Sequence, residues 1–297
     1  MKYIEWLNKN TESLRGKTVA VTGTTGGIGR ELCTYLAHLG ASLILMDRNK
    51  ARSESFGGEL SERFPDVEIK YIGVDLADMS SVKVATEQLL AENPDIFIHN
   101  AGAYSIPRCT CDTGYDNVFQ INFVSPYYMI RSLLPRLRLC GGRVAVVGSI
   151  AHNYSRTDRN DIDFSTRSKA SLVYGNAKRY LMFSLLRLFE NEDCVKLSVT
   201  HPGITFTNIT AHYPKLIFAI IKHPMKVIFM KPKKAALSVL FGIFATPSAK
   251  EREWIGPRIF DVWGLPRIKK LKTATEEEIS YIFDTAEGIY KTLCESC

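Results

Sequence analysis

A glycine-rich turn between an apolar strand and an amphipathic helix constrains the fold of this chain more than any other feature. Residues 17–22 are mostly apolar or β-branched and have the length of one strand. Residues 23–29 contain four glycines, and residues 30–39 then place Leu32, Leu36 and Leu39 on one helical stripe. Strand and helix patterns alternate up to residue 201, which is typical of βαβ units. We therefore predict an α/β fold with a doubly wound parallel sheet.

The same turn is suited to binding a dinucleotide. Glycines let the backbone approach a pyrophosphate, and the N-terminus of the following helix offers free N–H groups and a partial positive charge. The next predicted strand, residues 42–46, is followed by Asp47, whose carboxylate can accept hydrogen bonds from an adenosine ribose. A flexible glycine turn without a ligand is the alternative, but it does not explain why a strand and a helix flank the glycines.

Tyr174 and Lys178 lie four residues apart in a segment, about 168–190, that is predicted to be helical. Residues at this spacing share one helix face, with side chains about 5–6 Å apart at the base. An ammonium beside a phenol favours the phenolate and lowers the Tyr pKa from about 10, which suits an acid/base for an alcohol/carbonyl pair. With thirteen tyrosines in the chain this spacing arises about once by chance, so the interpretation depends on the other motifs.

Together these motifs resemble the short-chain dehydrogenases/reductases. The spacing Thr22-Gly23-x-x-x-Gly27-x-Gly29 is similar to that of the single-domain branch, and the resemblance covers roughly residues 14–262. It extends to retinol-dehydrogenase-like and hydroxysteroid-dehydrogenase-like members. The resemblance implies a Rossmann fold and an oxidoreductase that transfers a hydride between a nicotinamide cofactor and an alcohol, ketone or aldehyde. A dehydratase or epimerase is the alternative enzyme, because the same Tyr and Lys can serve that chemistry.

The resemblance assigns a catalytic set of four residues: Asn122, Ser149, Tyr174 and Lys178. It implies that Ser149 bonds the substrate oxygen, that Tyr174 exchanges the proton, and that Lys178 bonds the nicotinamide ribose. Asn122 would hold a water that links Lys178 to solvent. The predicted cofactor contacts are Gly23, Thr25, Gly27, Ile28, Gly29, Asp47, Arg48, Asp75, Leu76, Asn100, Ala101, Gly102, Tyr174, Lys178, Pro202, Gly203, Ile204, Thr205 and Thr207.

The pair Asp47-Arg48 bears on the choice of cofactor. In retinol-dehydrogenase-like members an uncharged residue precedes the Arg that holds the 2′-phosphate of NADP. Here a carboxylate precedes it, which would repel a phosphate but can bond both ribose hydroxyls of NAD. We therefore predict NAD, with NADP as the alternative, and expect Arg48 to stack on adenine or to pair with Asp47. Three other departures, His99, Gly148 and Ala177, remove no group that the chemistry requires.

The sequence shows no repeat or linker, so we predict a single domain over residues 1–297. Its parts are a dinucleotide-binding and catalytic core at 14–206, a helical substrate lid at 207–250, and a last strand, near 254–260, with a C-terminal tail at 251–297. The lid is rich in apolar residues at 216–221 and 227–230, between lysines. It is interpreted as the cover of a pocket for a steroid, retinoid or fatty alcohol, as a basic element that contacts an anionic membrane, or as a helix pair packed on the core or a partner subunit.

Charge and cysteine content narrow the other classes. The net charge of +7 comes without interleaved aromatics or a known nucleic-acid module, so nucleic acid is not an expected partner. Seven cysteines without framework spacing fit a reducing compartment, and we expect a cytoplasmic or membrane-peripheral protein. Cys109 with Cys111, and Cys294 with Cys297, could be read as a metal site, but no metal is predicted. His152 is interpreted as a packing or hydrogen-bonding residue.

Two further classes compete with an enzyme. A dinucleotide-binding sensor on the same fold would keep the glycine turn and lose the catalytic set, and a membrane-peripheral scaffold would be built around the apolar segment. The first fifteen residues lack the apolar core of a secretory signal, and no stretch reaches the length of a membrane span. The resemblance also implies a homo-oligomer, a dimer or tetramer, formed through the helix that carries Tyr174.

Overall fold

The computed structural model describes residues 2–204, 230–271 and 274–295. Its centre is one sheet, in which the described strands follow the order β3-β2-β1-β4-β5-β6-β7-β8. β1 to β7 pair in parallel, and β8 pairs antiparallel with β7. The strands are β1 Thr18–Thr22, β2 Ser42–Asp47, β3 Ile69–Gly73, β4 Ile96–His99, β5 Arg143–Val147, β6 Lys196–Thr200, β7 Glu253–Ile259 and β8 Trp263–Lys270.

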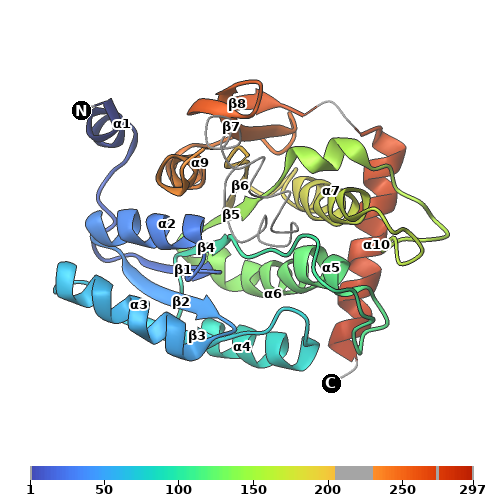
Figure 1. Ribbon diagram of the computed structural model, residues 1–297, viewed down its shortest axis with the longest axis horizontal. Helices are drawn as coiled ribbons and strands as arrows, with labels where there is room; N and C mark the ends of the chain where they lie inside the picture. The colour runs from blue at the N-terminus through green and yellow to red at the C-terminus, as the bar shows by residue number, and fades with distance from the viewer. Residues whose placement is uncertain (1, 205–229, 272–273, 296–297) are drawn as a thin grey trace, which may run out of the picture.

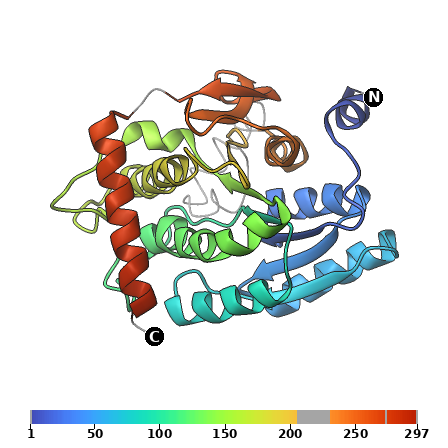
Figure 2. The same ribbon diagram turned by 180° about the vertical axis from the view of Figure 1, so that it is seen from behind.

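Helices cover both faces of the sheet (Figures 1 and 2). α2, α3 and α9 pack on one face, and α4, α6, α7 and α10 pack on the other. The described helices are α1 Lys2–Asn10, α2 Gly27–His38, α3 Lys50–Arg63, α4 Met79–Ala91, α5 Asn117–Phe119, η1 Gln120–Val124, α6 Ser125–Cys140, η2 Ile150–Tyr154, α7 Ala170–Leu188, α9 Pro232–Phe244 and α10 Glu276–Glu295. The prediction of a doubly wound α/β fold is confirmed.

Side chains of the central strands alternate between two apolar cores. In β1, Ala20 faces the layer with α4 and α6, whereas Val19 and Val21 face the layer with α2 and α9. This alternation follows from the period of two in a strand, and it explains why the strands read as continuous apolar runs. Because the strands are parallel, each crossover helix carries the chain back to the amino edge of the sheet, and all these strands end at the same carboxyl edge.

The C-terminal third differs in part from expectation. Residues 251–297 were expected to hold a last strand and a tail, but the described residues there form β7, β8 and α10. Of the predicted lid at 207–250, residues 207–229 lie outside the described part of the chain. The described remainder contains α9, which is buried against β5, β6 and α2. α9 is therefore a packed layer of the core. None of the described helices is long and apolar enough to span a bilayer.

Candidate active site

The predicted site residues converge at the carboxyl edge of the sheet. Gly23 follows β1, Asp47 ends β2, Asn100 follows β4 and Ser149 follows β5. β1 lies between β2 and β4. The chain runs from β1 to β2 and β3 on one side, and it then crosses back to β4 on the other side of β1. In open α/β sheets this switch point forms the ligand crevice.

The glycine turn is shaped by close backbone approach. Gly23 has φ +72, and a Cβ there would lie 2.9 Å from the Cα of Ala101. A Cβ on Gly29 would overlap the carbonyl oxygen of Gly23. Only glycine fits both positions, because a side chain would push the turn away from the neighbouring loop.

The first turn of α2 has the features of an anion site. α3 and α4 begin with side-chain caps from Asn49 and Asp78, whereas Gly26 at the start of α2 supplies none. The N–H groups of the first turn, which includes Gly27, Ile28 and Gly29, therefore have no side-chain cap. This arrangement fits the pyrophosphate of a dinucleotide.

Asp47 is held against the glycine turn by threonines. Its Oδ2 accepts hydrogen bonds from the backbone N–H (3.0 Å) and the hydroxyl of Thr24, and its Oδ1 accepts one from the Thr25 hydroxyl (3.1 Å). A carboxylate has about four acceptor positions, so roughly one is left unless a hydroxyl turns away. Arg48 does not pair with Asp47, as one expectation had it, but approaches Asp75 at 3.8 Å on the surface.

The turn after β4 braces the glycine turn. Asn100 donates from Nδ2 to the carbonyls of Thr22 (3.1 Å) and Gly23 (3.0 Å). The backbone N–H groups of Asn100 and Ala101 both donate to the Thr22 hydroxyl, each at 3.1 Å. Leu76, predicted as an adenine contact, is 8% exposed and packs in the core.

Asn122 lies in η1, a short π-helical segment between α5 and α6. Its Nδ2 donates to the carbonyls of Ala103 and Val118, both at 2.8 Å, and its Oδ1 accepts from the N–H of Ala103 at 3.3 Å. A Cβ on Gly102 would lie 2.8 Å from Oδ1 of Asn122 and 3.6 Å from Nζ of Lys178. Both amide hydrogens are thus used within the protein, so the side chain acts here as a brace.

Ser149 and Tyr174 meet at the end of β5. The Ser149 hydroxyl lies near the Tyr174 hydroxyl. It accepts a hydrogen bond from the N–H of Ala151 at 3.2 Å, where it caps η2. The Tyr174 ring keeps part of its surface accessible. Tyr104 packs edge-on against this ring, with centroids 5.3 Å apart.

Lys178 lies below the Tyr174 ring, with Nζ 5.7 Å from its centroid, and donates to the carbonyl of Val147 at 2.8 Å. The expectation that Lys178 lowers the Tyr174 pKa is not met in this structure. Burial raises the pKa of Tyr174 to about 12, while the nearby Ser149 hydroxyl pulls it downward. Burial also lowers the pKa of Lys178 to about 7, so near neutral pH a large fraction of its amino groups is uncharged.

Two residues that the motif reasoning did not assign to the site contact it. Tyr104 follows the Asn-Ala-Gly turn by two residues, and no spacing rule marks it as a neighbour of Tyr174. His99 is fully buried, with Nδ1 3.1 Å from the Thr22 hydroxyl, and burial together with Lys178 lowers its pKa well below the usual range. The resemblance leads one to expect an Asn at position 99, so the His there was the signal that could have marked this residue.

The loop at 202–207, which the resemblance places on the nicotinamide side of the cofactor and which we call the nicotinamide-side loop, is described only in part, because residues 205–207 lie outside the described residues. Pro202 and Gly203 are buried, and Gly203 has φ +82. Ile204 accepts from the N–H of Met230 at 2.8 Å.

His152 is buried, with Nδ1 2.5 Å from the Ser149 carbonyl oxygen, and it packs edge-on against Trp254, as expected for a packing residue. In the described part of the chain, no group of three or more His, Cys, Asp and Glu side chains could hold a metal.

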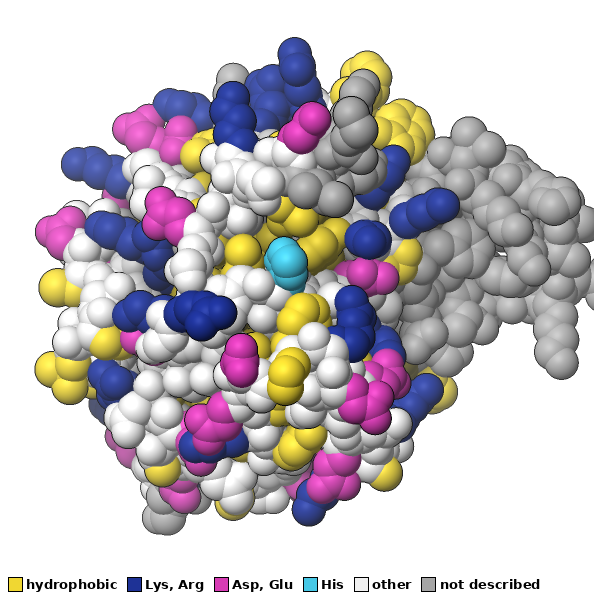
Figure 3. Space-filling model, turned by 90° about the vertical axis from the view of Figure 1, so that its left-hand side faces the viewer, with side chains coloured by type: hydrophobic (Ala, Val, Ile, Leu, Met, Phe, Trp, Pro, Cys, Tyr) yellow, Lys and Arg dark blue, Asp and Glu magenta, His cyan; other side chains and the backbone are white. Residues whose placement is uncertain are grey.

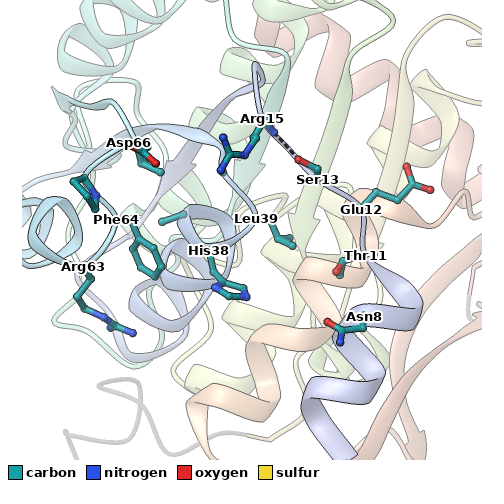
Figure 4. Close-up of a pocket in the computed structure, with 14 residues that line it drawn as sticks. Asn8, Thr11, Glu12, Ser13, Arg15, His38, Leu39, Arg63, Phe64 and Asp66 are labelled. Atoms are coloured by element: carbon teal, nitrogen blue, oxygen red, sulfur yellow. Dashed lines mark hydrogen bonds between the residues drawn. The ribbon is translucent and has the colours of Figure 1, made fainter.

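A separate groove of about 610 Å³ lies at the amino edge of the sheet. Figure 4 shows Asn8 from α1 on one side of it and His38, Arg63 and Phe64 from the ends of α2 and α3 on the other. Figure 3 views the molecule from this side and shows Lys and Arg side chains interspersed with hydrophobic ones. None of the predicted site residues lines the groove. We therefore assign the chemistry to the carboxyl edge, where the polar groups converge.

Comparison with known proteins agrees with this geometry. The family model described as short chain dehydrogenase matches residues 17–215. The chain is similar to human "Retinol dehydrogenase 14", with 28% identity over 83% of this chain and 78% of that protein. It is also similar to bovine "Dehydrogenase/reductase SDR family member 13", with 35% identity over 77% of this chain but only 62% of that protein.

Among solved structures, the fold is similar to that of an alcohol dehydrogenase from the archaeon Thermococcus sibiricus, complexed with 5-hydroxy-NADP. The TM-score is 0.58 at 22% identity, and the match covers 74% of this chain and 87% of that one.

Proposed function

The chain belongs to the short-chain dehydrogenase/reductase family and is an NAD(P)-dependent oxidoreductase, and from this premise we propose that it interconverts a lipophilic alcohol and its carbonyl form with NAD as cofactor. The observation that carries the proposal is the cluster of Ser149, Tyr174 and Lys178 beside the switch point of the sheet. A sensor would need only the glycine turn. The polar cluster supports catalysis because it provides a proton donor and acceptor at the ligand crevice.

The proposed chemistry assigns one role to each group. The bound nicotinamide ring supplies or accepts the hydride. Ser149 holds the substrate oxygen, and Tyr174 takes its proton in oxidation or returns it in reduction. Lys178 lies close enough to stabilise the phenolate by its charge once it is protonated. The side chain of Asn122 holds the loop at Ala103 beside Lys178. The water that links Lys178 to solvent through Asn122 stays part of the proposal.

Replacing Tyr174 by Phe tests the catalytic assignment. The variant loses the only proton-transfer group in the proposal but keeps the ring that packs on Tyr104. We expect turnover to fall at least about 100-fold while the dinucleotide Kd stays within a factor of about two. Tyr154→Phe, at a tyrosine that is 57% exposed, is the matched control and should behave as wild type. Near-normal turnover of the Tyr174 variant would reject the assignment.

The choice of NAD rests on Asp47. Its carboxylate points at the turn and retains an acceptor position for a ribose hydroxyl, whereas a 2′-phosphate beside it would be repelled. Arg48 is exposed and its guanidinium lies 3.8 Å from the Asp75 carboxylate, so it is less suited to bind the 2′-phosphate of NADP. The similarity to a protein crystallised with an NADP analogue keeps NADP as the alternative.

Asp47→Ser tests this choice by removing the charge and keeping a small polar group. We expect wild type to bind NADH at least about tenfold tighter than NADPH, and the variant to lose that preference. Titrating both cofactors into both proteins by fluorescence measures the four Kd values. Asp66→Ser, at an exposed aspartate in the amino-edge groove, should leave all of them unchanged. A wild-type preference for NADPH would overturn the proposal of NAD.

The lipophilic substrate class is supported by the similarity to a retinol dehydrogenase and by the apolar sequence at 216–221 and 227–230. A steroid, a retinoid or a fatty alcohol fits this description. Turnover of these three alcohol classes and of short polar alcohols, measured with the preferred cofactor, separates them. Higher kcat/KM for the short polar alcohols would contradict the substrate class without affecting the catalytic assignment. The predicted homo-oligomer, and contact of the 215–234 segment with a membrane, also stay proposals.

A further inference from the structure

Exposed apolar side chains gather on one hairpin of this protein. Among the described residues, five of the eight exposed large hydrophobics lie in the β7–β8 hairpin. We call these five the hairpin patch: Ile259 at 48% exposure, Phe260 at 85%, Trp263 at 38%, Leu265 at 41% and Ile268 at 36%. The other three, at positions 84, 139 and 154, lie on separate elements. Scattered apolar residues are ordinary on a surface, but several on one hairpin, where Ile259 pairs with Trp263, indicate an interaction site.

The turn of the hairpin holds its most exposed ring outward under backbone strain. Phe260 and Asp261 both have positive φ, 49° and 59°, although neither is glycine. Such a conformation is uncommon for residues other than glycine, above all for a bulky one. The Asp261 carboxylate is paired with Lys269 at 2.6 Å, and the N–H of Val262 donates to the carbonyl of Ile259 at 3.0 Å. The strain is thus offset by contacts that keep Phe260 in solvent.

Cations flank the hairpin patch. Residues 253–270 contain four cationic and two anionic side chains. Lys269 is paired with Asp261, and Lys270 with Glu251. Arg258 and Arg267 are exposed and form no ion pair with any residue in the described ranges. An apolar tip with flanking cations is complementary to the acyl chains and anionic headgroups of a lipid surface.

We propose that the β7–β8 hairpin docks the protein on an anionic lipid bilayer, with Phe260 and Trp263 inserted at the headgroup level. A second copy of the chain is the competing occupant, because β8 is the edge strand of the sheet. Pro266 lacks the N–H that edge pairing requires, and the hairpin of a second copy would carry the same exposed cations, Arg258 and Arg267. A lipid surface meets neither obstacle, so the observations favour it.

The hairpin turn also contacts the rim of the candidate active site. A Cβ on Gly203 would lie 2.8 Å from the carbonyl oxygen of Val262 and 3.2 Å from Cγ of Pro257. Docking through this hairpin therefore brings the nicotinamide-side loop toward the bilayer. That a lipophilic alcohol enters the site from the bilayer rests on the proposed function, whereas docking itself does not.

Vesicle co-sedimentation tests the docking. Wild type should pellet with vesicles of phosphatidylcholine and phosphatidylserine, and less with phosphatidylcholine alone or at high salt. Phe260→Ser/Trp263→Ser should weaken binding at least about tenfold, since both aromatic side chains would no longer be buried in the lipid. Leu139→Ser is the matched control, because Leu139 is 83% exposed at the end of α6, and it should bind as wild type. Arg258→Glu/Arg267→Glu should remove the preference for phosphatidylserine.

Several outcomes would overturn the proposal. One is that wild type fails to pellet with either vesicle, and another is that the Phe260/Trp263 variant pellets as well as wild type. A molar mass of that variant in light scattering that is half the wild-type value would assign the hairpin to contact with a second copy. Thermal melting confirms that each variant is folded without using activity. Inactive protein that still binds vesicles would contradict the proposed function alone, and active protein that ignores vesicles would contradict the docking alone.

Discussion

Lys178 is a cation in an unfavourable place. Its side chain is 1% exposed, its amino group donates only to the Val147 carbonyl, and no ion pair to it occurs among the described residues. Burial favours the neutral amine, which is why its pKa is lowered to about 7. The residue therefore costs the folded state free energy, which fits a position kept for chemistry.

Lys178→Met should stabilise the protein and abolish turnover. Since the ordinary Lys pKa is 10.5 and the folded value is about 7, the unfolded chain binds more protons between these pH values. Wild-type stability contributed by this group thus rises with pH through that window, and the full penalty applies below it. We expect the substitution to raise the free energy of unfolding by about 1–3 kcal/mol at pH 6 and by less at pH 9.

Urea unfolding at both pH values measures this difference. Lys169→Met, at an exposed lysine just before α7, is the matched control and should change stability little at either pH. A Lys178→Met variant that is less stable than wild type at pH 6 would show that the buried amino group contributes net stability.

For single residues, the sequence predicted which side chains come together better than it predicted their protonation states. The spacing of Tyr174 and Lys178 led to one helix face, and the structure has Lys178 Nζ 5.7 Å from the centroid of the Tyr174 ring. The direction of the Tyr174 pKa could not be read from spacing, because it depends on burial and on where the Lys178 amino group is bonded. The hydrogen bonds from Thr24 and Thr25 to Asp47 could not be predicted either, because they depend on the geometry of the glycine turn.

At the scale of elements, α7 is fixed by an ion pair to α10. Arg179 donates from Nε and Nη2 to the Glu278 carboxylate at 2.7 and 2.6 Å, and its side chain is 1% exposed. Arg179 also donates to the carbonyl of His152 at 3.1 Å. Burial pulls the Glu278 pKa upward, but the bonds from Arg179 outweigh it and the pKa is lowered. The C-terminal helix thus anchors the helix that carries Tyr174.

Glu278→Gln and Glu277→Gln form a matched pair of variants. The first leaves the guanidinium of Arg179 buried without its counter-charge and should lower the free energy of unfolding by about 3 kcal/mol or more. The second removes a surface pair with Arg159 and should change stability little. Because the Glu278 pKa is lowered on folding, its contribution is present above its ordinary pKa and fades as the pH falls.

Denaturant titration of both variants at pH 7 and at pH 4 checks the size and the pH dependence together. Equal stability of the two variants at pH 7 would show that α10 is held by its apolar face alone.

Elements were predictable where one pattern dominated. Residues 17–201 alternate apolar strands with helices, and each predicted strand there was found. β8 was missed because Gly264 and Pro266 interrupt its pattern, and antiparallel pairing with β7 supplies the stability that propensity does not. The π-helical turn around Asn122 was missed for a different reason: a change from α to π hydrogen bonding leaves no mark in residue type.

For the whole molecule, the sequence predicted the layers of the fold but not which surfaces are available for binding. The doubly wound sheet followed from the alternation of elements, and its carboxyl edge followed as the ligand side. The groove at the opposite edge could not be predicted, because it depends on how α1, α2 and α3 meet. The hairpin patch was missed because β8 itself was not predicted. Net charge gave no guide either, since Arg258 and Arg267 are only two of the 38 Lys and Arg residues.

The alternation of strand side chains between two cores ties the folding of the whole chain together. β1, β2 and β4 each contribute side chains to both cores, so both helical layers pack on the same strands. If α2 and α9 separated from it, the strands would expose one face to water and the opposite core would lose the rigidity of its floor. The two layers are therefore expected to melt in one cooperative step, with no half-molecule that could persist alone.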